Sequence, residues 1–217
     1  MAKGKFLDLH RHLPSTIFVV IMLVVVTAIA AVIVYAGVYN IGADAPHSKF
    51  VTMTLQQVRE RAIVHHSRNI VPPADLDSPK RLTVGAGLYT EMCSSCHLGP
   101  GLEKSELSQG LYPPAPELAR GSTRSAAQQF WMIKHGVKLS AMPAWGKTHS
   151  DDLIWDMVGF IRTLPKLSPE QYLAALATAP GGHDAIMEGM AAMGHHQAKP
   201  PEAAEHSHSQ QPHADTH

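Results

Sequence analysis

The sequence predicts an all-α protein with one N-terminal transmembrane helix, a domain of three to four short helices, and a flexible C-terminal tail. Three observations support this fold class. A single uncharged apolar run occupies residues 17–38. Apolar residues recur at helical spacing within residues 79–176, and no segment shows the alternation typical of a β-strand. From residue 177 the composition shifts to Gly, Pro, Ala and polar residues, which cannot bury a core.

Composition limits the kinds of partner. Lys plus Arg and Asp plus Glu both total 18, so the net charge of zero argues against nucleic acid or another polyanion. Two cysteines exclude a disulfide framework. The 15 histidines and 10 methionines are many for this length, and both side chains are metal ligands. Their positions therefore carry more information than their totals.

The apolar run at residues 17–38 reaches about 33 Å as a helix, which is enough to span a bilayer core. Ser15 and Thr16 are plausible caps at its start. A cleaved signal peptide is the alternative, but its small residues would follow the apolar core, whereas those of this chain lie inside it. We therefore favour an uncleaved anchor. The basic residues of segment 1–16 outnumber its acid and predict a cytoplasmic N-terminus, with the rest of the chain across the membrane. They are Lys3, Lys5 and Arg11, against Asp8.

Residues 39–78 are predicted to connect the anchor to the domain. Their first part, HSKFVTMTLQQVRERAIVHHSRNI, has apolar residues at loosely helical spacing and predicts a short amphipathic helix. The segment VPPADLDSP ends that helix, because each proline removes an amide donor and disfavours helix before it.

Three segments within residues 79–176 carry helix signals. The first begins at Pro79 after Ser78. The second, STRSAAQQFWMIKHG, stops at a glycine, and the third, SDDLIWDMVGFIRTLP, has a serine cap, two early acids and a closing proline. Helices this short, joined by long loops rich in Gly and Pro, make a poor core. We therefore expect something other than protein to fill the centre.

The only cysteines lie in the segment CSSCH, as Cys93 and Cys96, and His97 follows directly. C-x-x-C-H is a haem-attachment signature, in which each thiol adds to a vinyl group and the imidazole reaches the iron. A thioredoxin-like dithiol needs a βαβ context, and a structural zinc site needs further ligands nearby; the sequence offers neither. A haem would fill the weak core, and the anchor places the motif outside the cytoplasm, where covalent attachment occurs in bacteria.

The segment SAMPAWG offers Met142 as the sixth ligand of the iron. Pro143 fixes the backbone after it and small residues flank it, so the thioether can approach a flat ring closely. Met132 is the nearest competitor, but it belongs to a helical pattern among bulky residues. His/Met ligation leaves no open coordination position and raises the reduction potential, which suits electron transfer.

Residues 79–165 resemble a class I cytochrome c domain through the segments GAGLYTEMCSSCH, AMPAWG and DLIWDMVGFIRTLP. The resemblance implies one covalent haem c and a contact between the first and last helices, formed by Gly85, Tyr89 and Phe160. It also implies that the histidine donates its second ring nitrogen to a backbone carbonyl downstream. Four prolines are candidates for that carbonyl: Pro100, Pro113, Pro114 and Pro116. Further residues expected at the haem pocket are Pro100, Tyr112, Arg120, Trp131 and Trp145, of which Arg120 and Trp145 could reach the propionates.

Two groups outside the haem ligands have competing interpretations. Lys134, Lys138 and Lys147 flank Met142 without an intervening acid, and they form either a basic rim that steers an acidic redox partner or ordinary solvated lysines. The tail at residues 177–217 either binds copper through thioethers and imidazoles or binds nothing in particular. Its copper candidates are Met187, Met190, Met193, His195 and His196.

Together these features predict an electron carrier rather than an enzyme, namely a periplasmic mono-haem cytochrome anchored in a bacterial inner membrane. Expected partners in a respiratory or dehydrogenase chain are a quinol-oxidising complex or a dehydrogenase as donor, and a terminal oxidase or a copper enzyme as acceptor. Three alternatives remain open. They are a fixed haem subunit of a larger membrane redox complex, a copper-binding protein that uses its tail, and a haem peroxidase or gas sensor from which Met142 leaves the iron.

Overall fold

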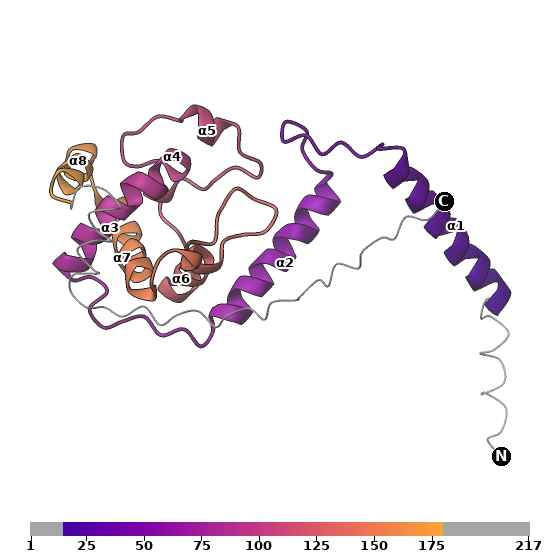
Figure 1. Cartoon of the computed structure of the whole chain (residues 1–217), viewed down its shortest axis with the longest axis horizontal. Helices are drawn as coiled ribbons and strands as arrows, with labels where there is room; N and C mark the ends of the chain where they lie inside the picture. Colours follow the sequence, from indigo (N-terminus) through magenta and orange to yellow (C-terminus); the bar gives the residue numbers. More distant parts are fainter. Residues whose placement is uncertain (1–14, 180–217) are drawn as a thin grey trace, which may run out of the picture. The chain divides into compact units, whose positions relative to one another are not determined.

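The computed structural model describes residues 15–179, and every regular element in this range is helical (Figure 1). The all-α prediction is therefore confirmed. The chain divides into two compact units, Met1–Ser48 and Lys49–His217.

The first unit contains the apolar helix α1, Thr16–Tyr35. Ser15 caps it, because its hydroxyl oxygen accepts a hydrogen bond from the Phe18 amide at 3.2 Å. Its side chains are all exposed, and its most apolar stretch has a mean hydropathy of 3.4. Among residues 15–179, α1 is the one helix long and apolar enough to cross a membrane.

The second unit is a helical bundle with long connecting loops (Figure 1). Its α-helices are α2 (Lys49–Ser67), α3 (Pro79–Met92), α4 (Ser94–His97), α5 (Glu106–Gln109), α6 (Ala126–His135), α7 (Asp151–Thr163) and α8 (Pro169–Ala177). Three 3-10 turns lie between them: η2 (Leu118–Arg120), η3 (Trp145–Lys147) and η4 (Leu164–Lys166). The sequence patterns predicted α2, α3, α6 and α7 and one helical turn at CSSCH, which is α4, but missed the short helices α5 and α8.

The centre of the bundle is the crossing of α3 and α7. Gly85 makes the close approach possible, because a Cβ there would overlap the Asp156 carbonyl oxygen and lie 2.9 Å from Phe160 Cβ. Beside this contact the rings of Tyr89 and Phe160 lie 5.7 Å apart between centroids. The three residues that the family resemblance assigned to this contact therefore do meet here.

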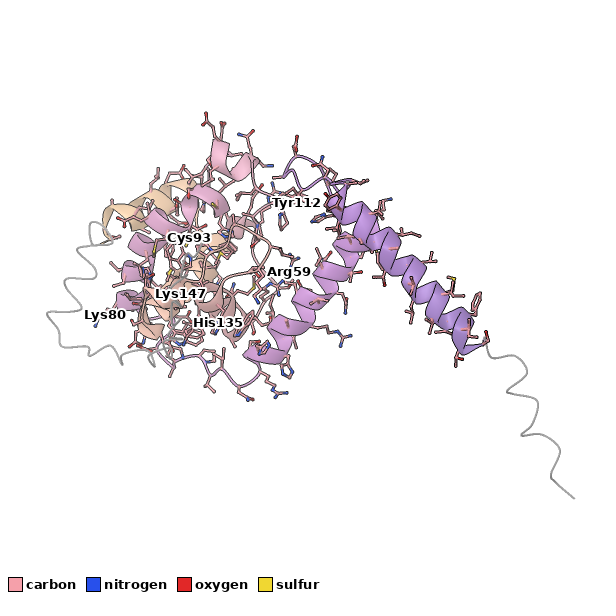
Figure 2. All side chains as sticks on the ribbon, turned by 45° about the vertical axis from the view of Figure 1, so that its right-hand side comes forward. Arg59, Lys80, Cys93, Tyr112, His135 and Lys147 are labelled. Atoms are coloured by element: carbon pink, nitrogen blue, oxygen red, sulfur yellow. The ribbon has the colours of Figure 1, made fainter. Side chains whose placement is uncertain are left out.

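Helix α7 is more deeply buried than an amphipathic surface helix. All nine residues from Leu153 to Ile161 are buried, since α3 and α6 both pack against it. Ser150 caps α7, with Asp151 and Asp152 in its first turn, as its sequence predicts. Figure 2 shows side chains filling this interior, and Cys93 lies among them with only 5% of its surface exposed.

Helix α2 packs against α6 and belongs to the bundle. Ile63 is 1% exposed, the Glu60 carboxylate pairs with Arg124 at 2.7 Å, and the His66 ring stacks on Trp131 at 5.5 Å. Glu60, Ile63 and His66 were predicted to lie in a connector outside the domain, and here they belong to the bundle. The segment between α1 and α2 is residues 36–48.

Candidate haem site

The segment CSSCH forms one turn of helix at the end of α3. Cys93 ends α3 and begins α4, and its carbonyl oxygen accepts a hydrogen bond from the His97 amide at 2.8 Å. This turn presents two thiols and an imidazole together. Both cysteines are free thiols, with Cys93 buried and Cys96 half-buried. Burial, followed by the nearby Cys96, raises the pKa of the Cys93 thiol to about 12, so this sulfur stays protonated in the chain without haem.

The His97 ring is fixed by a hydrogen bond of 2.8 Å between its Nδ1 atom and the Pro116 carbonyl oxygen. A carbonyl oxygen can only accept, so Nδ1 carries the proton and Nε2 keeps its lone pair for a metal. Burial lowers the pKa of His97, although the bond to Pro116 opposes that shift, and the neutral ring is thereby favoured. Of the four candidate prolines, Pro116 and not Pro100 supplies the carbonyl.

Met142 lies half-buried against the core, on the loop that joins α6 to η3. Its backbone is held at both polar groups: the amide donates to Ser140 Oγ and the carbonyl oxygen accepts from the Val137 amide, each at 3.2 Å. Gly136 lets this loop fold back on the end of α6, because its φ is +66° and a Cβ there would lie 2.7 Å from the Met142 carbonyl oxygen. The thioether therefore sits on an anchored loop.

These donors fit a covalently bound haem. Two thiols, one imidazole with a free Nε2 atom and one half-buried thioether are the groups that attach a c-type haem and ligate its iron. No group of three or more His, Cys, Asp or Glu side chains that could hold a metal ion occurs within residues 15–179.

A family model described as cytochrome c oxidase, cbb3-type, subunit III matches residues 80–161. The matched segment runs from the start of α3 to near the end of α7, and it contains both the CSSCH turn and the Met142 loop. Residues 80–161 are a class I cytochrome c domain. No curated protein matches the chain. No solved structure matches it either. A domain of this kind carries covalent haem c and transfers electrons.

The other predicted pocket residues of the cytochrome domain have varied surroundings. Trp145 is half-buried against the core and meets His149 edge to face at 5.5 Å. The Arg120 side chain is 80% exposed and pairs with Glu117, yet it lines a surface pocket of about 250 Å³ together with Cys96. At the contact of α6 with α2, the Trp131 ring stacks on that of His66 and lies tilted beside that of His135, 5.2 Å away. Tyr112 precedes the cis bond to Pro113.

The basic rim of the cytochrome domain is smaller than its sequence indicates. Lys134 pairs with Asp151 at 2.7 Å, because the first residue of α7 folds back beside the end of α6. Lys138, on the loop that carries Met142, and Lys147, at the end of η3, remain exposed. The copper candidates Met187, Met190, Met193, His195 and His196 lie outside the described residues.

The sequence analysis missed two contacts that hold the cytochrome domain together. One is the packing of α2, whose helix was expected but whose place in the bundle was not. The other is α8, whose Tyr172 is 1% exposed. The segment SPEQ before this tyrosine is a capping-box signature and would have predicted the helix.

Proposed function

We propose that this chain is a membrane-anchored electron carrier in a bacterial respiratory or dehydrogenase chain, with its cytochrome domain on the periplasmic side. The proposal joins the cytochrome domain to α1, which has the length and composition of a membrane span. The three basic residues ahead of α1 favour a cytoplasmic N-terminus. Attachment of haem to CSSCH requires the opposite side of the membrane, and the two arguments agree.

Each site residue has one task in this proposal. Cys93 and Cys96 would hold the haem through two thioether links, and His97 Nε2 and Met142 would ligate its iron. A haem c held in this way would supply one reversible electron. With two protein ligands the iron would offer no position to a substrate, which suits a carrier rather than an enzyme.

The hydrogen bond between His97 and Pro116 is the observation that carries this function. It fixes the tautomer and the plane of the imidazole before any metal is bound. An imidazole whose orientation is already fixed would move little when the iron changes its oxidation state. A small structural rearrangement between the two states favours rapid electron transfer. Cys93 belongs to the buried core that α3, α6 and α7 form, so this part of the site is shielded from water.

Lys138 and Lys147 favour redox partners with acidic surfaces. Lys138 lies on the loop of Met142 and Lys147 in the turn η3 that follows it, so both are within a few residues of the proposed iron ligand. Opposite charge on such a partner would raise the rate of encounter and make it depend on salt. A quinol-oxidising complex or a dehydrogenase as donor, and a terminal oxidase or a copper enzyme as acceptor, could present such surfaces.

A second candidate is a fixed haem subunit of a larger membrane complex. The family model favours it, because its description is that of an oxidase subunit. In this case the chain would stay with its partners when the membrane is dissolved gently. As a free carrier it would migrate alone.

Both candidates can be tested on the full chain purified in mild detergent. We expect haem to remain on the chain after denaturing electrophoresis, and the reduced spectrum to be that of a low-spin c-type cytochrome. A Cys93→Ser/Cys96→Ser variant should lose the covalent haem. A chain that lacks covalent haem when expressed with a haem-attachment system would contradict the proposal, and native electrophoresis of the haem-stained band separates the carrier from the subunit.

A further inference from the structure

Helix α8 follows the matched cytochrome segment and packs against α3 (Figure 1). A capping box starts it: Ser168 Oγ accepts from the Gln171 amide at 3.2 Å, and Gln171 Oε1 accepts from the Ser168 amide at 2.9 Å. Tyr172 is the one fully buried side chain of α8, and its ring stacks near Phe160 of α7 at 6.5 Å. Tyr172 is thus the side chain through which α8 packs into the interior of the bundle.

Tyr172 lies directly against the backbone that follows His97. A Cβ at Gly99 would lie 2.6 Å from Tyr172 Cζ and 2.8 Å from its hydroxyl oxygen. Two residues later, a Cβ at Gly101 would lie 2.8 Å from Pro169 Cβ, the first residue of α8. Only glycine fits at these two places. The backbone of the segment Leu98–Gly101 therefore lies directly against the rings of Tyr172 and Pro169 of α8.

A second tyrosine holds the same segment. The Tyr89 hydroxyl donates to the Leu98 carbonyl oxygen, and Leu98 itself has a φ of +60°, which a side-chain-bearing residue rarely adopts. Tyr89 and Tyr172 both lie next to Phe160. The residue immediately after the iron ligand is therefore kept in an uncommon conformation by contacts from α3 and, through Gly99, from α8.

The Tyr172 hydroxyl contributes little to this contact by hydrogen bonding. It is buried and makes no hydrogen bond of ordinary geometry, although the Thr90 side chain lies near enough to interact with it. A buried hydroxyl without a good partner opposes folding, so the contribution of Tyr172 lies mainly in its ring. This separates the ring from the hydroxyl and makes phenylalanine the matched conservative replacement.

We propose that α8 clamps the segment Leu98–Gly101 and that Tyr172 is a positioning residue, which sets the orientation of the His97 imidazole and thereby the reduction potential of the haem. The inference rests on the proposed function, because it takes His97 as the iron ligand. Outer contacts of a ligating histidine orient its ring and tune the metal. Pro116 holds the ring at Nδ1, and Tyr172 holds the backbone from which the ring extends.

The test compares three variants of the full, haem-loaded chain in detergent. Tyr172→Ala removes the ring, Tyr172→Phe keeps it, and Leu173→Ala changes a neighbouring side chain of α8 that is 59% exposed. The readouts are the reduction potential, and the low-spin electron paramagnetic resonance spectrum of the oxidised protein, which reports the orientation of the axial ligands. We expect Tyr172→Ala to shift both, and Tyr172→Phe and Leu173→Ala to match the wild type.

If Tyr172→Ala does not retain haem, the variant Gly99→Ala tests the same contact from the other side. Its added methyl group should push the segment away from the ring and shift the same two readouts, and Tyr172→Phe should not relieve this shift. Loss of thermal stability in Tyr172→Ala with an unchanged potential and spectrum would overturn the clamp, as would an equal shift in Tyr172→Phe. A wild-type chain without low-spin His/Met haem would instead overturn the proposed function, so the two failures are distinct.

Discussion

The ligands of the proposed iron site differ in what holds them. The His97 ring is tied to Pro116 through a side-chain atom, whereas Met142 is tied through its backbone to Ser140 and Val137. The imidazole is therefore positioned by a hydrogen bond of its own ring, whereas the thioether is positioned only through the backbone of its loop. Met142 is the ligand whose loss the rest of the site would tolerate best.

Replacement of Met142 by alanine should remove the sixth ligand without preventing haem attachment. We expect the oxidised protein to lose the weak long-wavelength absorption band of Met–iron(III) ligation, its reduction potential to fall, and the reduced protein to bind carbon monoxide. Met132→Ala, which changes a half-buried methionine on α6, is the matched control and should keep the band. If Met132→Ala lost the band and Met142→Ala kept it, the ligand assignment would be wrong.

Asp156 is a buried carboxylate at the crossing of α3 and α7. It accepts a hydrogen bond from Arg81 at 2.7 Å, but burial outweighs this partner and raises the pKa of Asp156 from 3.8 to about 6. The folded protein therefore binds this proton more tightly than the unfolded chain. Its contribution favours folding at low pH and is lost as the pH rises through the folded pKa.

The free energy of unfolding of the wild type should accordingly fall, relative to that of Asp156→Asn, as the pH rises from 3.8 to about 6. Asparagine keeps the shape of the side chain but does not titrate, so other titrating groups cancel in the comparison. Denaturant unfolding at several pH values, followed by haem absorbance, measures the difference. Parallel curves for the two proteins would show that Asp156 keeps an ordinary pKa.

Among the elements, α2 changes most between its sequence pattern and its place in the structure. Its exposed apolar residues would fit a helix that lies outside the domain, since Phe50 is 79% exposed and Val64 is 54% exposed. Its C-terminal half is nevertheless held to the bundle: Ile63 is buried, Glu60 pairs with Arg124 just before α6, and His66 stacks on Trp131 of α6. Burial of Ile63 is the largest of these, because exposed ion pairs contribute little.

Ile63→Ala should lower the free energy of unfolding of the haem-loaded chain by about 2–4 kcal/mol, the usual cost of truncating a buried isoleucine. Val64→Ala, one residue further on the exposed side of α2, should change it by less than about 0.5 kcal/mol. Denaturant unfolding followed by haem absorbance measures both values. Equal and small effects would mean that α2 is a loose connector in solution.

At the scale of the whole molecule, an apolar helix and a cytochrome bundle are joined by residues 36–48. Helix α1 exposes its entire apolar surface, which in water would be unfavourable and in a bilayer would not. The bundle has its own core. In the proposed function α1 would tether the redox domain to a membrane, and the tether would keep it near membrane-bound donors and acceptors.

The haem-bearing chain should stay in the membrane pellet after an alkaline wash, because one apolar span of this length is held by the bilayer. A periplasm-active reporter fused after Ser48 should be active, and the same reporter fused to the N-terminus should not. Reversing the charges of Lys3, Lys5 and Arg11 should weaken this orientation. Release by the wash, or an active reporter at the N-terminus, would contradict the anchored topology.

Much of the fold and the site followed from local patterns. The helices α3, α6 and α7 carry their own caps and stop signals, and CSSCH specifies its chemistry within a single turn, so neither needs information from distant residues. The choice of Pro116 could not be predicted in this way. Four prolines were equivalent in sequence, and only the path of the loop after α4 brings one carbonyl oxygen within 2.8 Å of His97.

The sequence by itself determined the helical class, the apolar span and the CSSCH turn, because each depends on residues close together in the chain. Met142 as the second iron ligand stays a prediction from the same local pattern. Tertiary structure decided which groups meet across long separations. It placed α2 on α6, paired Lys134 with Asp151 and so reduced the basic rim, and brought Tyr172 against Gly99. Burial and contact depend on how the helices pack, and packing is settled by the whole bundle at once.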